Sequence, residues 1–289
     1  MKVVKLLLLC SLPILLWSCA TTPTGTQTSQ TAEKRVALVI GNNNYSNLEK
    51  KHQLKQAVQD AQDMRDKLRK LGFKVFYGEN LSLSDMKKQL NNFTSEIDKD
   101  TLSFVYYSGH GASDPKGLNY LIPSDFDGTK GLAVDEIVFQ HMKEKKSAKN
   151  ILALDMCRSN GVSIGGNTKG LAKGDIAINS PYNPDQKHDT DGVFIGYSTD
   201  PNNYSYEDYS LGNSRYTHFL LQHIDDKTLS VSELFGRVTT EVMEASKKAS
   251  EGKSKDEKEI QSPWNNSSLK GDDIFLAKMP MSSEMGSRP

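Results

Sequence analysis

Cysteine is scarce in this chain, and the scarcity excludes several kinds of site. The 289 residues contain three cysteines, Cys10, Cys19 and Cys157, and the first two lie in an apolar N-terminal segment. The single thiol left in the rest of the chain cannot form a disulfide within it, which excludes a disulfide-stapled fold. Cys-x-x-Cys pairs and clustered histidines are absent too, so we expect no metal site and no cofactor.

An excess of charge of one sign is also missing. Lys and Arg together number 36, as do Asp and Glu, which gives a formal net charge of +0 at pH 7. No basic stripe with interleaved aromatic residues is present, and we therefore expect no nucleic-acid partner. Internal repeats are absent. Residues 34–279 have the length of one sizeable domain.

Long hydrophobic runs are limited to the N-terminus. Two lysines precede the apolar run at residues 6–17, and small residues follow it at 18–20. About a dozen apolar residues are too few for a membrane span, and the pattern predicts a cleaved export signal. Residues 16–19 resemble the lipobox of bacterial lipoproteins, with Trp17 an unusual occupant. The resemblance implies that Cys19 is diacylated and becomes the mature N-terminus. The alternative is an ordinary signal peptide in which Cys19 is incidental.

These features predict four segments. They are a lipoprotein signal peptide at 1–19, a disordered tether rich in Thr, Gln, Ser and Gly at 20–33, a single folded domain at 34–279 and a flexible tail at 280–289. Two acyl chains give stable membrane anchoring. We therefore expect an exported protein, anchored by its N-terminal lipid in a bacterial cell envelope and facing the periplasm or the cell surface.

Short apolar runs alternate with helical patterns through the domain. The expected strands lie at 35–41, 73–77, 102–108, 118–122, 151–156, 193–198 and 273–277, and the expected helices at 54–71, 84–97, 135–145, 213–223 and 230–249. This alternation predicts an α/β fold, a three-layer α/β/α sandwich around a mostly parallel six-stranded sheet.

Two of the expected strands end in reactive side chains. One leads into Gly109-His110-Gly111 and the other into Asp155-Met156-Cys157. The carboxyl ends of parallel strands share one edge of the sheet, so His110 and Cys157 are expected to meet although 47 positions separate them. A thiol beside an imidazole is a nucleophile with its base. The alternatives are an inert buried thiol and a histidine that only stabilises its own turn.

The chain resembles the caspase-like cysteine peptidases of the caspase-hemoglobinase fold, and within them it is most similar to the paracaspase branch. A histidine about 50 residues before the cysteine is typical of caspases. The resemblance covers residues 35–277 and rests on the segments 36–42, 44–45, 54–60, 71–75, 106–111, 154–158 and 196–199.

The resemblance implies a cysteine endopeptidase. Cys157 would attack the scissile carbonyl, and His110 would give a proton to the leaving amine. The backbone N–H groups of Gly111 and Cys157 would form the oxyanion hole. The glycines at 109 and 111 permit the close backbone approach that this role needs.

The resemblance also implies a preference for a basic residue at P1, the substrate residue that supplies the scissile carbonyl. Asp155 shares a strand face with Cys157, and Asp60 matches a second pocket acid of paracaspases. A further acid of some paracaspases falls near Tyr204, and Asp200 or Glu207 would have to replace it. A guanidinium can meet two carboxylates in a fork, which favours Arg over Lys at P1. The alternatives are a solvated position or a helix cap for Asp60, and a structural role for Asp155.

Further expectations concern loops and edges. The substrate is expected to lie extended beside the strand that ends at 197–199. The loop at 159–191 offers Lys169, Lys173 and Lys187 for self-cleavage, with the uncut chain active.

Asn213 and Ser214, together with residues 262–264, are expected to pack the core or a loop, with Trp264 as a wall or core aromatic. A homodimer could form through a sheet edge at 273–277. The alternatives to a peptidase are a catalytically silent caspase-like binding module and a structural envelope lipoprotein.

Overall fold

A computed structural model describes residues 33–114, 116–142, 147, 149–158, 169, 192–254, 258–269 and 273–277. The expected signal peptide with Cys19, almost all of the expected tether, and the tail at 280–289 lie outside these residues. So does the loop at 159–191 apart from Lys169, including Lys173 and Lys187. Within the described ranges, no helix combines the length and apolar character that crossing a bilayer requires.

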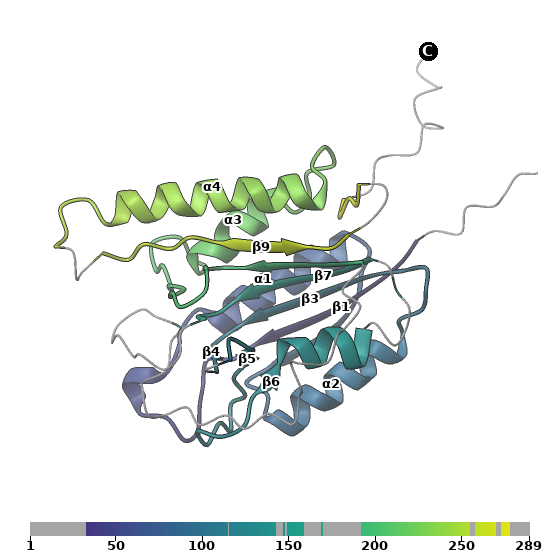
Figure 1. Ribbon diagram of the computed structural model, residues 1–289, viewed down its shortest axis with the longest axis horizontal. Coiled ribbons are helices and arrows are strands. Elements are labelled where there is room, and N and C mark those ends of the chain that lie inside the picture. Colours follow the sequence, from purple (N-terminus) through teal and green to yellow (C-terminus); the bar gives the residue numbers. More distant parts are fainter. Residues whose placement is uncertain are drawn as a thin grey trace, which may run out of the picture. The chain divides into compact units, whose positions relative to one another are not determined.

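One six-stranded sheet forms the centre of the domain (Figure 1). Its strands follow the order β2-β1-β3-β7-β8-β9. The first five are parallel and β9 runs antiparallel to β8. The strands are β1 (Lys34–Gly41), β2 (Lys74–Glu79), β3 (Thr101–Ser108), β7 (Lys149–Asp155), β8 (Val193–Tyr197) and β9 (Trp264–Ser267). A smaller sheet joins β4 (Gly111–Ser113), β5 (Asn119–Leu121) and β6 (Leu132–Ala133).

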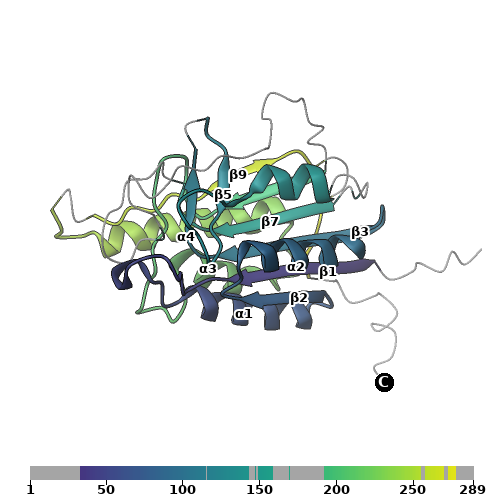
Figure 2. The same cartoon turned by 90° about the horizontal axis from the view of Figure 1, so that it is seen from below.

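Helices cover both faces of the large sheet, which confirms the three-layer α/β/α sandwich (Figures 1 and 2). The helices α1 (Ala57–Lys70), α3 (Arg215–His223) and α4 (Val231–Ala249) pack on one face. On the other lie α2 (Leu83–Ser95) and the π-helical segment Glu136–Met142. Side chains alternate along each strand, so Ala37 and Val39 of β1 join the first core and Leu38 the second. The strands β1, β3, β7 and β8 are buried on both sides because helices cover both faces of the sheet.

Helix starts are fixed by local and distant groups. Ser230 caps α4 in a capping box with Glu233, and Ser82 caps α2. In contrast, α1 has no side-chain cap from its own N-cap residue. Instead Glu207 accepts hydrogen bonds from the backbone N–H groups just before α1 begins. A carboxylate is favourable at a helix N-terminus, so Glu207 holds the end of α1 that carries Asp60.

The expected last strand is wrong. Residues 273–277 form no strand, and the sixth strand is β9 instead. The apolar side chains that suggested a strand pack into the core beside α4, with Leu276 2% exposed. The carbonyl of Ile274 accepts a hydrogen bond from Val231 at 2.7 Å rather than from a neighbouring strand. β9 has a polar sequence and owes its conformation to pairing with β8, so tertiary context overrides its weak strand propensity.

Two other boundaries differ from expectation. The helix expected at 135–145 is a π-helical segment over Glu136–Met142, and residues 143–145 lie outside the described part of the chain. The small sheet continues directly from His110 through β4, whereas the sequence indicated only a short strand near 118–122. This sheet and the loop at 42–56 enclose a third apolar cluster that includes Tyr45 and Ala112.

Candidate active site

The carboxyl ends of the central strands meet as expected. Ser108 at the end of β3 pairs with Gly41 of β1 on one side and with Asp155 of β7 on the other. The Gly109 N–H donates to the Asp155 carbonyl at 3.3 Å. A Cβ atom at Gly111 would lie 2.4 Å from the Cys157 carbonyl oxygen. The loops that carry His110 and Cys157 are therefore in direct backbone contact.

His110 is buried and held in one orientation. Its backbone N–H donates to the Tyr45 hydroxyl at 2.7 Å, and the two rings lie 4.5 Å apart. Its Nε2 atom lies 2.6 Å from the His52 carbonyl oxygen. A carbonyl oxygen can only accept, so Nε2 carries the proton of the neutral ring and Nδ1 carries the lone pair. Nδ1 is buried and has no hydrogen-bond partner within the described residues. Burial lowers the pKa of His110. The ring is therefore a base whose lone pair is free.

Cys157 is also buried, and Ser205 holds its sulfur. The Ser205 N–H donates to Sγ at 3.1 Å, and Sγ lies 3.6 Å from the Ser205 carbonyl oxygen. Burial raises the pKa of the Cys157 thiol to about 12, although the Ser205 N–H and the charge of Lys169 act in the opposite direction. Because burial also lowers the pKa of His110, the two side chains rest as a neutral thiol and a neutral imidazole.

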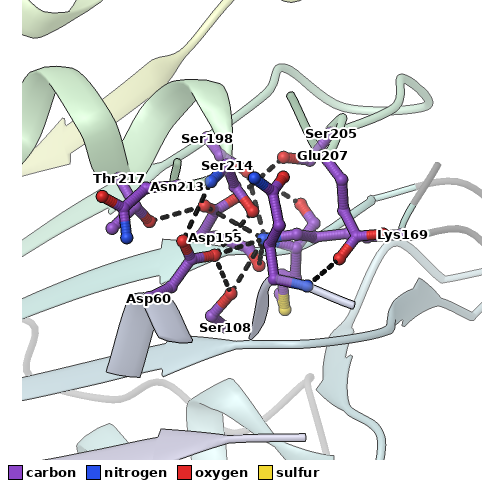
Figure 3. Close-up of polar contacts among 12 residues, drawn as sticks. Asp60, Ser108, Asp155, Lys169, Ser198, Ser205, Glu207, Asn213, Ser214 and Thr217 are labelled. Carbon is purple, nitrogen blue, oxygen red and sulfur yellow. Dashed lines mark hydrogen bonds and ion pairs between the residues drawn. The ribbon is translucent and has the colours of Figure 1, made fainter. Parts of the chain in front are cut away.

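Asp60 and Asp155 lie in one buried network (Figure 3). Asp155 accepts hydrogen bonds from the hydroxyls of Ser205 and Thr217, both at 2.7 Å. Asp60 accepts from the Ser108 hydroxyl at 2.8 Å and from the backbone N–H of Ser214 at 2.9 Å. The Ser214 hydroxyl donates to it as well. The network draws its members from α1, α3, the ends of β3 and β7, and the segment after β8.

The side chain of Lys169 fills the space between the two acids (Figure 3). Its Nζ atom lies 3.0 Å from Asp155 Oδ2 and 3.4 Å from Asp60 Oδ2, and none of the three side chains is exposed. Nζ also donates to the Ser108 hydroxyl at 2.8 Å and to the Asp155 carbonyl at 3.3 Å. Oxygen atoms thus surround a single nitrogen, which suits an ammonium group.

The backbone of Lys169 is held on both sides. Its N–H donates to the Ser205 carbonyl at 3.0 Å. Its carbonyl accepts from the Gly111 N–H at 3.3 Å. Gly111 is the residue whose N–H was expected to serve the oxyanion hole, and here that N–H meets the carbonyl of a lysine whose side chain lies between the two acids.

The charges of the pocket balance in part. Burial alone would lower the pKa of Lys169, but the carboxylates of Asp155 and Asp60 outweigh it and the pKa is raised. Lys169 is therefore a cation. Burial raises the pKa of Asp60; Lys169 opposes this shift and the charge of Asp155 adds to it. The pocket thus favours one buried cation beside the two acids.

The structure distinguishes between the two acids considered as replacements near Tyr204. Glu207 is buried, and its charge raises the pKa of Lys169 after those of Asp155 and Asp60. Its carboxylate binds the backbone before α1, so it neighbours the pocket without being among the atoms that bind the ammonium. Asp200 instead accepts a hydrogen bond from Asn203 at 3.1 Å.

Four pocket residues were missed in the sequence: Ser108, Ser205, Ser214 and Thr217. Ser214 was expected to pack a core or loop, yet its N–H and hydroxyl both bind Asp60. Its position at the N-cap of α3 was the available signal, because serine is favoured there and the first N–H groups of a helix are free to bind a carboxylate. Ser205 lies 48 positions from Cys157 in a segment without periodicity, and the sequence offers no signal for it.

The strand end beside which the substrate was expected to lie is partly occupied by contacts within the chain. Ser205, in the segment after β8, binds the Lys169 backbone, whereas Ser198 is buried and exchanges hydrogen bonds with the backbone of Met156 at 3.0 and 3.1 Å. Trp264 is 38% exposed, so it is not a core residue. Its ring lies 4.9 Å from the guanidinium of Arg158, the residue after Cys157. Of the two expectations for Trp264, its exposure excludes a core aromatic, and the role as a wall stays a prediction.

Comparison with known proteins places this geometry in context. The caspase domain family matches residues 34–273. The human mucosa-associated lymphoid tissue lymphoma translocation protein 1 is 34% identical over 131 residues, which are 44% of this chain and 15% of the human protein. The mouse homolog is 33% identical over the same shares. The match therefore spans about 15% of the length of these curated relatives. These findings support the expected caspase-like, paracaspase-related peptidase.

Proposed function

The chain belongs to the caspase domain family of cysteine peptidases, and we propose that it hydrolyses peptide bonds after basic P1 residues. In this proposal Cys157 is the nucleophile, His110 is its base, and Asp60 and Asp155 bind the P1 side chain. The observation that carries the proposal is the placement of Lys169, whose ammonium lies between two buried acids while its carbonyl accepts from the Gly111 N–H.

The resting state of the dyad defines the first chemical step. A neutral thiol attacks slowly, so the proton must leave Sγ as the bond to the carbonyl carbon forms. Nδ1 of His110 is the free lone pair that can take it, and the His52 carbonyl stabilises the imidazolium through the Nε2 proton. His110 then gives the proton to the leaving amine. The backbone N–H groups of Gly111 and Cys157 would stabilise the oxyanion.

The pocket sets the P1 preference by charge. A basic side chain completes a network in which Asp60 and Asp155 are already buried and hydrogen-bonded. An acidic P1 side chain would bring a third carboxylate into the same buried space, which is strongly unfavourable. The pocket holds a lysine in this structure, and the two carboxylates also offer a guanidinium a pair of partners. We therefore propose that both Lys and Arg are accepted.

Fluorogenic peptides that differ only at P1 test the proposal. The full-length chain should cleave after Lys and Arg and leave Asp untouched. The Asp155→Asn variant should lose most of this activity. Asp66→Asn serves as the matched control, because Asp66 lies on the exposed side of α1 and binds Arg65. Equal activity of both variants, or cleavage after Asp, would contradict the pocket assignment.

We further propose that the peptidase acts in a bacterial cell envelope, anchored through lipid on Cys19. The support is the sequence at 1–20 alone. Replacing Cys19 with Ser should release the protein from the membrane fraction and abolish labelling by a clickable fatty acid. If the chain also dimerises through the edge of its large sheet, β9 is the strand at that edge beside β8, rather than residues 273–277.

A further inference from the structure

Of the segment 159–191 the structure describes Lys169 alone, and this residue lies at the centre of the candidate site. A fully buried lysine is unusual because taking an ammonium out of water is costly. The two carboxylates offset that cost here. A lysine in the core could be a structural ion pair and nothing more, and the contacts of its backbone decide between the two interpretations.

A structural ion pair needs only the side chain, whereas a substrate must also be held by its backbone. Lys169 meets all three requirements of a bound P1 residue. Its side chain lies in the acidic pocket, its N–H donates to the Ser205 carbonyl, and its own carbonyl accepts from the Gly111 N–H. The Cys157 sulfur is hydrogen-bonded to the same Ser205 that binds the Lys169 backbone. A purely structural salt bridge does not require the Lys169 carbonyl to face the Gly111 N–H, which is expected to stabilise the oxyanion.

We propose that Lys169 is the P1 residue of an intramolecular substrate, which closes the pocket of the uncut chain to other substrates until Cys157 cleaves the peptide bond after Lys169. This proposal rests on the proposed function and adds to it a specific cleavage site and a latent state. It also changes an expectation from the sequence, because an uncut chain whose pocket holds its own lysine cannot be fully active on other substrates.

The cleavage follows the chemistry of the site. Cys157 Sγ forms a bond to the Lys169 carbonyl carbon, and its proton passes to Nδ1 of His110. The C–N bond to Gly170 breaks, and the proton moves from His110 to the amine of Gly170. Water then attacks the thioester, the S–C bond breaks, and one water proton returns to Sγ through His110. The products are a carboxylate on Lys169 and a free amine on Gly170.

Tethering determines how strong the block is. A tethered ligand on a short linker experiences an effective concentration on the order of millimolar. Micromolar peptides compete poorly against it, and we expect about 10–100-fold suppression of their cleavage in the uncut chain. Cutting frees Lys169 from the segment that follows it. It also places a new carboxylate close to two acids, which favours release of the cut end.

Mass spectrometry of the full-length wild-type chain is the first test, since it requires no substitution. The intact mass should give way to two fragments that meet at Lys169 and Gly170, with first-order kinetics independent of protein concentration. Basic peptides should be cleaved after a lag that matches this conversion. Cys157→Ala should stay intact by itself, and it should be cut far more slowly when mixed with wild-type chain. Cleavage that accelerates with concentration would overturn the intramolecular assignment.

Three variants separate the pocket from the rest of the loop. Lys169→Ala should remain uncut at this position and cleave basic peptides without a lag, about 10–100-fold faster than fresh wild type. Lys169→Arg keeps the positive charge and should retain both the lag and the cut. It therefore provides a folded variant for comparison if Lys169→Ala does not fold because Asp60 and Asp155 have lost their cation. The matched control is Lys173→Ala, from the same segment, which should behave as wild type. Loss of the lag in Lys173→Ala would show that the loop in general, rather than Lys169, blocks the pocket.

The outcomes distinguish this proposal from the proposed function. If the wild-type chain cleaves basic peptides from the first turnover and stays intact, the peptidase assignment stands and the role of Lys169 is wrong. If wild type, Lys169→Ala and Lys169→Arg all fold, remain whole and cleave no peptide, the proposed function itself fails. A wild-type chain that is blocked without ever being cut would overturn the cleavage.

Discussion

The ammonium of Lys169 lies closer to the carboxylate of Asp155, at 3.0 Å, than to that of Asp60, at 3.4 Å. Asp155 therefore supplies the larger part of the charge that keeps Lys169 protonated in a buried site. Asp155 also connects the pocket to the nucleophile, because Ser205 donates its hydroxyl to Asp155 and its N–H to Cys157. Because Asp155 contacts the ammonium directly and the sulfur only through Ser205, a change at Asp155 should affect binding of a basic P1 side chain more than the reactivity of the thiol.

Removing either member of the proposed dyad, Cys157 or His110, should abolish peptide cleavage. Cys157→Ala removes the nucleophilic sulfur, and His110→Ala removes the base whose Nδ1 lone pair is free among the described residues. The two act as one unit, so the double variant should be little slower than either single variant. Cleavage of a fluorogenic basic peptide measures the rate, and circular dichroism checks that each variant folds. Residual activity within about tenfold of wild type in Cys157→Ala would contradict the assignment.

Replacing Asp155 with Asn should lower kcat/KM for basic peptides by about 10²–10³-fold, because a buried cation would lose its main partner, a loss of about 3–4 kcal/mol. Labelling of Cys157 by a small uncharged alkylating reagent should change far less. This separation of binding from thiol reactivity is the expected result of a pocket role. Equal loss of peptide cleavage and of labelling would indicate instead that Asp155→Asn disturbs the fold.

Ser214→Ala should weaken the pocket through Asp60. The substitution removes one hydroxyl donor from a buried carboxylate and leaves the backbone donor in place. We expect a loss of about 1–2 kcal/mol in unfolding free energy and a KM for basic peptides raised about tenfold, with kcat nearly unchanged. Ser210→Ala is the control, because its hydroxyl binds Asp208 at 2.6 Å, away from Asp60. Equal effects of the two substitutions would refute the positioning role of Ser214.

Two glycine substitutions should act in opposite directions. A Cβ at Gly111 would come within 2.4 Å of the Cys157 carbonyl oxygen, a backbone atom that cannot move without shifting the nucleophile. We expect Gly111→Ala to abolish activity. Gly236 lies on the exposed side of α4, and a Cβ added there would meet no atom within 4 Å. Gly236→Ala should therefore stabilise the helix by about 0.5–1 kcal/mol and leave activity unchanged. Thermal unfolding and peptide cleavage report both effects.

The pH dependence of thiol alkylation should reveal the buried state of Cys157. Burial raises the pKa of the thiol to about 12, so the thiolate fraction of the uncut chain is small at neutral pH and rises with pH. The labelling rate should increase about tenfold per pH unit from about pH 7 to about pH 10 without reaching a plateau. Peptide mapping assigns the label to Cys157 rather than Cys10 or Cys19. A plateau near neutral pH would show that Cys157 rests as a thiolate.

The sequence anticipated much of the sheet because strands that are buried on both faces consist of continuous apolar residues. The runs that became β1, β3, β7 and β8 are continuous and apolar, and such runs are typical of parallel strands covered by helices. The turn residues after β3 and β7 indicated which side chains reach the common edge. For β9 the same logic failed, because its polar residues become a strand only through pairing with β8.

Of the residues in the buried network, the sequence analysis named the two acids and missed the hydroxyl groups that bind them. Asp60 and Asp155 came from resemblance to a family, and the structure brings both against one lysine. The sequence does not reveal Ser205 and Thr217, since a hydroxyl can orient Asp155 from any segment that the fold brings close to it. Serine and threonine are common on any surface, so their presence in the sequence carries little information.

The sequence by itself determined the layered α/β fold, the meeting of His110 with the Cys157 strand, and the supply of lysines in the segment at 159–191. Local pattern was enough for these because parallel strands place their carboxyl ends at one edge of the sheet. Only the tertiary structure decided which lysine lies between Asp60 and Asp155, and that its carbonyl meets the Gly111 N–H. Both depend on distances between residues far apart in the chain, and a pattern of neighbouring residues contains no such distances.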